Sequence, residues 1–116
     1  MIADDLSPEE VAKAIEVAVS EWPGNCWYIC EWLLETDLLP DGSTHKRGRY
    51  TGALIYGKYR AEILVWSDDI GSGRHSWIEA PDGTVIDPTR YVFEGVEPYI
   101  YMGARDNYVE EKGAAH

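Results

Sequence analysis

The first forty residues place apolar side chains at the spacing of an α-helix. From residue 8 to about residue 20 they recur every three or four positions, which predicts a helix with one apolar face. Ser7, a proline after it and then Glu10 are typical of a helix start, because Ser7 and Glu10 can each accept from the other's backbone N–H. A Trp-Pro-Gly segment at 22–24 interrupts the pattern, and residues 26–36 carry apolar groups on nearly every side of a second predicted helix. We expect that second helix to be buried at the centre of the fold.

Beyond residue 42 the spacing changes to the two-residue alternation of strands. The segments expected to form strands are 50–56, 59–66, 75–80, 84–87 and 99–102. A Gly-Lys pair at 57–58 is expected to form a hairpin turn, residues 67–74 and 92–98 to form loops, and the tail after 103 to be a short helix or frayed. Helices followed by strands are typical of the α+β class. We therefore predict one domain over residues 1–116, with N-terminal helices packed on an antiparallel sheet.

The segment from His75 to Asp87 predicts a hairpin whose register can be derived. A Pro-Asp-Gly loop at 81–83 suits a three-residue turn, because proline fits the first turn position and glycine the left-handed one. With that turn Trp77 faces Asp87, and His75 lies diagonal to Asp87 on the same face of the sheet. A two-residue turn would point Asp87 to the opposite face. Contact between the imidazole and the carboxylate therefore depends on the three-residue turn.

Negative charge is concentrated in the N-terminal part of the chain. The formal net charge is −11, and residues 1–41 hold ten of the 21 acidic residues with a single base, Lys13. This balance argues against nucleic-acid binding, because phosphates would be repelled. The basic stretch at 45–49 is expected to be a solvated loop rather than a binding site. No segment has the roughly 20 apolar residues of a membrane helix, and the acidic start is unlike a signal peptide, so we expect a cytoplasmic, non-membrane protein.

Cys26, His75 and Asp87 have the residue types and the chain order of a thiol-based acyl-transfer site. Asn25 is expected to cap the second helix, so Cys26 would lie in its first turn, where the helix dipole favours the nucleophilic thiolate. His75 would stabilise that thiolate and protonate the leaving group, while Asp87 would fix the tautomer of the imidazole. Cys30, one helical turn further on, is expected to be a free thiol in the core.

Each of the three residues also has a structural interpretation. Cys26 could be a plain buried thiol, His75 a structural histidine, and Asp87 the cap of a turn. A zinc site made with Cys30 fits poorly, since a closed site needs four ligands at recognised spacings, and neither a metal nor another cofactor is expected.

An acyl-transfer site also needs N–H donors for the oxyanion, and the backbone N–H of Cys26 is one natural donor. The second donor stays open among Asn25, Ser20 and the indole of Trp22, which are all near in sequence. Trp77 is expected to lie in the core or in the wall of a cleft.

These motifs resemble the transglutaminase-like branch of the papain-like cysteine protease superfamily. Cys26 and Trp27 stand at the helix start, and His-Ser-Trp-Ile-Glu at 75–79 resembles the family's His-x-Trp-x-Glu strand. The sequence at 82–89 resembles its Asp-Gly turn leading to Asp-Pro-Thr. The resemblance covers about residues 22–102. It implies a papain-like core in which the three candidate residues act on an amide or ester carbonyl of a protein or peptide substrate.

Two functions remain after this comparison of motifs. The first is a cysteine-dependent hydrolase or acyltransferase, and hydrolysis and transfer to an amine stay open because both share the first half-reaction. The alternative is a catalytically silent binding module on the same fold, whose acidic surface occupies a basic partner. The sequence leaves the substrate and the oligomeric state open.

Overall fold

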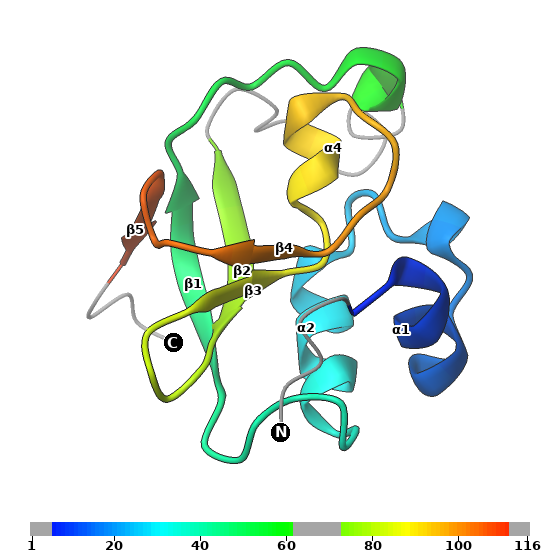
Figure 1. The fold of residues 1–116 in the computed structure, drawn as a ribbon. Coiled ribbons are helices and arrows are strands. Elements are labelled where there is room, and N and C mark those ends of the chain that lie inside the picture. The colour runs from blue at the N-terminus through cyan, green and yellow to red at the C-terminus, as the bar shows by residue number, and fades with distance from the viewer. Residues whose placement is uncertain (1–5, 62–72, 112–116) are drawn as a thin grey trace.

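In the computed structural model, which describes residues 6–61 and 73–111, helices pack against a five-stranded antiparallel sheet (Figure 1). The strands have the spatial order β4-β3-β2-β1-β5, and their bounds are β1 (Thr44–Tyr50), β2 (Arg74–Glu79), β3 (Val85–Asp87), β4 (Tyr101–Gly103) and β5 (Tyr108–Glu110). The helices are α1 (Pro8–Ile15), α2 (Cys26–Leu34) and α4 (Arg90–Glu94), with short 3₁₀ turns η1 (Val19–Glu21) and η2 (Gly57–Tyr59). The predicted α+β class, with N-terminal helices on an antiparallel sheet, is confirmed. In the described ranges, no helix has the length and apolar character needed to cross a membrane.

Helix α1 starts as predicted and ends earlier than predicted. The Ser7 hydroxyl accepts from the Glu10 N–H at 3.2 Å, and the Glu10 carboxylate accepts from the Ser7 N–H at 3.1 Å, which completes the capping box. Glu16 then adopts a left-handed conformation with φ of 62° and closes the helix. Val17 and Val19 pack against the core from the segment after this reversal, so they contribute the apolar positions that had suggested a longer helix.

Helix α2 is not buried on every side, which corrects the prediction. Its buried face consists of Ile29, Cys30 and Leu33. Three aromatic residues point to solvent instead, with 40%, 53% and 39% of their surface exposed at Trp27, Tyr28 and Trp32. Asn25 stands at the N-cap but makes no side-chain cap hydrogen bond, so the predicted cap is also wrong.

Strand β1 replaces the predicted basic loop at 45–49 and lies between β2 and β5. Lys46 is neutralised across the sheet, where it lies 3.7 Å from Glu79 and 3.6 Å from Glu110. The predicted strand at 50–56 and hairpin turn at 57–58 are wrong, because β1 ends at Tyr50 and residues 57–59 form η2. Most of the strand predicted at 59–66 and of the loop predicted at 67–74 lies outside the described residues.

The hairpin between β2 and β3 has the predicted register. Ile78 pairs with Ile86, and the Ala80 N–H donates to the Thr84 carbonyl at 2.9 Å, which leaves a three-residue loop. Gly83 has φ of +91°, the left-handed conformation that the turn requires. His75 and Asp87 therefore lie on the same face of the sheet, as derived from the sequence.

The chain after β3 is more regular than predicted. Helix α4 includes the first part of the loop expected at 92–98, and β5 lies in the tail that was expected to be helical or frayed. The last predicted strand, at 99–102, corresponds to β4 with a shift of its bounds. Both α4 and β5 matter for the site, because they supply the side chains that surround His75 and Asp87.

Candidate functional site

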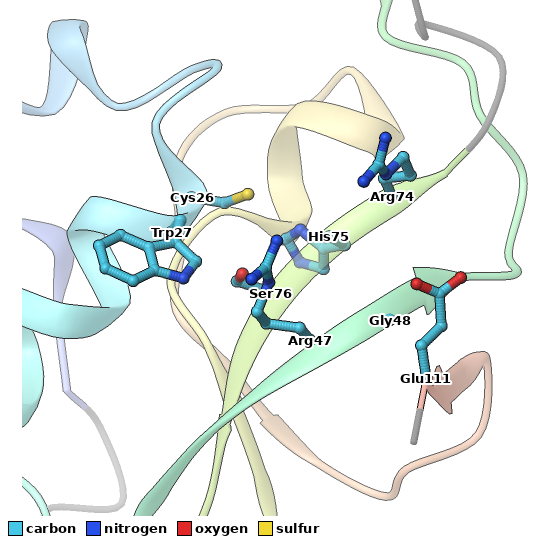
Figure 2. Close-up of a pocket in the computed structure, with 8 residues that line it drawn as sticks. All are labelled: Cys26, Trp27, Arg47, Gly48, Arg74, His75, Ser76 and Glu111. Carbon is cyan, nitrogen blue, oxygen red and sulfur yellow. The ribbon is translucent and has the colours of Figure 1, made fainter. Parts of the chain in front are cut away.

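Cys26 is the first residue of α2, and it lies at a pocket of about 280 Å³ where the helix meets the sheet (Figure 2). The pocket is lined by Cys26, Trp27, Arg47, Gly48, Arg74, His75, Ser76 and Glu111. The cysteine side chain is partly exposed, and Figure 2 shows its sulfur on the side that faces His75. A helix N-terminus, the sheet and an opening to solvent thus meet at one thiol.

His75 and Asp87 form a buried pair beside this thiol. The Nε2 of His75 lies 2.7 Å from the Oδ2 of Asp87, and the two side chains are 1% and 0% exposed. The contact follows from the hairpin register, which places both residues on one face of neighbouring strands. Because Nε2 is engaged with Asp87, Nδ1 is the ring nitrogen that remains for the thiol. Nδ1 is buried and has no hydrogen bond of ordinary length to a described residue.

Asp87 takes part in three hydrogen bonds, of which the sequence suggested the contact with His75 and the turn cap but not the bond from Tyr108. Its Oδ2 also accepts from the Tyr108 hydroxyl at 2.7 Å, and its Oδ1 accepts from the Thr89 N–H at 3.0 Å. Burial and the charge of Asp87 raise the pKa of Tyr108, so the phenol keeps its proton and remains a donor. These bonds fix the orientation of the Asp87 carboxylate before any substrate binds. Asp87 therefore caps the turn and holds His75 at the same time.

The electrostatics of the site favour a charged cysteine–histidine pair. Burial opposes ionisation of Cys26, but the neighbouring imidazole of His75, together with the Ser76 backbone amide, lowers the pKa of the thiol. Burial likewise opposes the charge on His75, whereas Asp87 and then Cys26 raise the pKa of the imidazole to about 10. At neutral pH both effects favour thiolate and imidazolium.

Cys30 provides an internal comparison, since it lies one turn from Cys26 on the same helix. It is fully buried, as predicted, and burial raises the pKa of its thiol, with further contributions from the charges of Asp87 and Cys26. Two free thiols four residues apart thus have opposite shifts. The difference arises because only Cys26 has His75 and the Ser76 amide beside it.

The surroundings of His75 are aromatic and exclude water. Its ring centroid lies 4.7 Å from that of Phe93, 6.1 Å from Trp77 and 6.4 Å from both Tyr50 and Tyr108. Trp77, expected in the core or in a cleft wall, is 3% exposed and does not line the pocket, so it belongs to the core. A low local dielectric of this kind strengthens the bond between the imidazole and Asp87.

None of the three side chains expected as the second oxyanion donor is placed for that role. The Asn25 amide donates to the Glu21 carbonyl at 2.8 Å. The indole of Trp22 is fully buried and donates to the Val17 carbonyl at 3.1 Å. Ser20 is exposed and lines a separate pocket that does not contain Cys26. Sequence proximity suggested these residues, but the fold directs their donors elsewhere.

Four polar residues that line the pocket were not predicted as site residues from the sequence. Arg47 and Arg74 are exposed arginines, the Ser76 amide helps to lower the pKa of the thiol, and Glu111 pairs with Arg49 at 3.2 Å. The segment that forms β1 was predicted to be a loop, so the register that brings these residues to Cys26 was not available. Knowledge of the β1–β2 register, in which Arg47 pairs with Ser76, would have placed Arg47 beside Cys26.

Over residues 6–61 and 73–111, no group of three or more His, Cys, Asp or Glu side chains is arranged to hold a metal ion. Comparison of the chain with family models, with curated proteins and with solved structures found no match.

Proposed function

We propose that this protein is a cysteine-dependent hydrolase or acyltransferase that acts on an amide or ester carbonyl, with Cys26 as nucleophile. The observation that carries the proposal is the buried bond between His75 and Asp87 beside a thiol of lowered pKa that lines an open pocket. Nucleophilic cysteines are recognised by this combination of a thiolate, a base within reach and a third group that orients the base.

In the first half-reaction, the Cys26 thiolate attacks the carbonyl carbon, a C–S bond forms, and the carbonyl π electrons move to the oxygen. The backbone N–H of Cys26, at the start of α2, is the proposed donor to that oxyanion. When the C=O bond re-forms, the bond to the leaving nitrogen or oxygen breaks. The proton on Nδ1 of His75 passes to the leaving group, and an acyl thioester on Cys26 remains.

In the second half-reaction, the neutral imidazole takes a proton from water or from an amine as that nucleophile attacks the thioester. Collapse of the second tetrahedral intermediate breaks the C–S bond and restores the thiolate and the imidazolium. Asp87 keeps its charge throughout and holds the ring so that Nδ1 faces the sulfur. Water as acceptor gives hydrolysis, whereas an amine gives transfer.

The proposal includes the finer fold assignment. The helix that begins at Cys26, the strand with His75 and the next strand with Asp87 occur in the order that the resemblance to the transglutaminase-like branch implies. We accordingly propose a papain-like core and a peptide or protein substrate.

Site-resolved alkylation with iodoacetamide at pH 6 tests the proposal. Each unit by which a thiol's pKa falls raises the thiolate fraction at that pH about ten-fold. We expect Cys26 to react faster than free cysteine, because its pKa is lowered. Cys30 is the matched control, because burial raises its pKa and it should stay unlabelled in the folded protein. A Cys26 that reacts no faster than free cysteine would remove the basis of the proposal.

A second candidate, the silent binding module, is favoured by the exposed aromatic row on α2. The ring centroids of Trp27 and Tyr28 lie 5.3 Å apart, and those of Tyr28 and Trp32 lie 5.6 Å apart. Glu35, at the C-cap of the same helix, is also exposed. Aromatic faces beside carboxylates suit cationic side chains. This candidate predicts capture of a basic partner that is unaffected by Cys26→Ala and lost at high salt.

A further inference from the structure

The pocket at Cys26 has a cationic rim in a chain that is otherwise strongly acidic. The formal net charge is −11, and the chain has 10 lysines and arginines in all, yet two arginines line this one pocket. In Figure 2 the guanidinium groups of Arg47 and Arg74 lie on either side of the imidazole of His75. A local positive charge against the overall balance requires a structural explanation.

The strand register accounts for the position of both arginines. Arg74 and Ser76 lie two residues apart on β2, so their side chains share a face of the sheet. Arg47 pairs with Ser76 across the β1–β2 ladder and therefore lies on that same face. Ser76 lines the pocket together with Cys26, so the sheet register places both arginines beside the nucleophile.

The opposing charges near the pocket are already engaged. Glu111, which also lines it, lies 3.2 Å from Nε of Arg49. Within the part of the chain that the structure describes, no carboxylate lies within ion-pair distance of Arg47. The guanidinium group of Arg47 therefore leaves positive charge available to a ligand in the pocket.

We propose that Arg47 and Arg74 select substrates that carry a carboxylate close to the reacting carbonyl. Guanidinium groups suit this role because their planar N–H donors match the two oxygens of a carboxylate. This inference rests on the proposed acyl-transfer function, and it names the substrate class of the same site. The carboxylate could belong to the acyl group or to the leaving group.

A pair of alkylating probes tests the charge preference without turnover. Iodoacetate and iodoacetamide both transfer a two-carbon group to the thiolate with loss of iodide, and they differ in the negative charge. The ratio of their rates at Cys26 should fall about two- to four-fold in Arg47→Gln and again in Arg74→Gln, since unit charges several ångströms apart near water interact by this much. The iodoacetamide rate reports any change in the thiol itself, and taking the ratio removes that change from the comparison.

Arg105→Gln is the matched control, because it removes the same charge from a residue that does not line the pocket and pairs with Glu79 at 3.7 Å. Its ratio should equal that of the wild type. The difference in this rate ratio between the wild type and Arg47→Gln should also shrink as ionic strength rises, because exposed charges are screened. A ratio that is the same in Arg47→Gln, Arg74→Gln and Arg105→Gln would overturn the proposal.

Two ester pairs distinguish the position of the carboxylate. 4-Nitrophenyl hydrogen succinate carries it on the acyl group and 4-acetoxybenzoate on the leaving group, and the methyl ester of each is its neutral partner. In one pair the charged ester should react faster than its neutral partner, and Arg47→Gln should abolish that preference. That pair shows whether the carboxylate belongs to the acyl group or to the leaving group. Equal rates within both pairs would contradict the inference. Slow iodoacetamide labelling of Cys26 would instead refute the acyl-transfer function, and an arginine-dependent probe ratio would still identify an anion site.

Discussion

Replacement of Asp87 by asparagine removes the charge that contributes most to the raised pKa of His75, with almost no change in shape. The carboxylate lies 2.7 Å from Nε2 of His75, and both groups are buried. Unit charges about 4 Å apart attract by about 4 kcal/mol at an effective dielectric constant of 20. The asparagine carbonyl can retain part of the hydrogen bond, so a net loss of about 3 kcal/mol is a reasonable expectation.

That loss appears in the titration of His75, because Asp87 contributes most to the rise in its pKa. At 1.36 kcal/mol for each pKa unit, the pKa of His75 should fall by about two units in Asp87→Asn. The assay is imidazole ¹⁵N NMR of His75 over a series of pH values. Circular dichroism should show that the variant is folded, at a cost of about 1–3 kcal/mol in stability.

Tyr108→Phe is the matched control. It deletes one 2.7 Å hydrogen bond to the same carboxylate oxygen and leaves the charge in place. The pKa of His75 should change by only about one unit, since a hydrogen bond to a charged group contributes about 1.5 kcal/mol or little more. A folded Asp87→Asn protein in which the pKa of His75 stays within about half a unit of the wild-type value would refute this electrostatic account.

Three further predictions concern stability. Because the pKa of His75 is raised to about 10, its contribution to the free energy of unfolding is fully present below pH 6.5 and is lost as the pH rises towards 10. Urea denaturation at a series of pH values should show this decline in stability, and a smaller decline in His75→Gln. Gly48→Ala should cost more than about 3 kcal/mol in thermal unfolding, since its Cβ would lie 2.0 Å from the Val109 carbonyl oxygen, and an unchanged Tm would contradict the close approach of β5 to β1. Gly83→Ala should cost only about 1 kcal/mol, because its φ is +91° but no atom lies within 4 Å of the added methyl group; a loss above 3 kcal/mol would point to a different turn.

The hairpin was predictable because local chemistry determines it. Proline and glycine at 81 and 83 fix the turn, the turn fixes the register, and the register brings His75 to Asp87 without any other part of the chain. The start of α1 was predictable for the same reason, since its capping box lies within four residues.

Strand β1 was not predictable from the same kind of pattern. Its sequence, THKRGRY, has no apolar alternation, and its charges are tolerated because Glu79, Glu110 and Glu111 approach from other segments. The exposure of the aromatic residues on α2 is likewise set by how the helix sits on the sheet, which its own composition does not encode. Tyr108, 21 residues from Asp87, reaches it only because β5 joins the far edge of the sheet.

The protonation state of His75 in the resting protein is the most direct test of an ion pair between Cys26 and the buried histidine. Imidazole ¹⁵N NMR between pH 6 and 9 should show both ring nitrogens of His75 protonated up to pH 8, with the transition at lower pH in Cys26→Ser. A His75 that titrates near 6.5, equally with and without the Cys26 sulfur, would contradict the account.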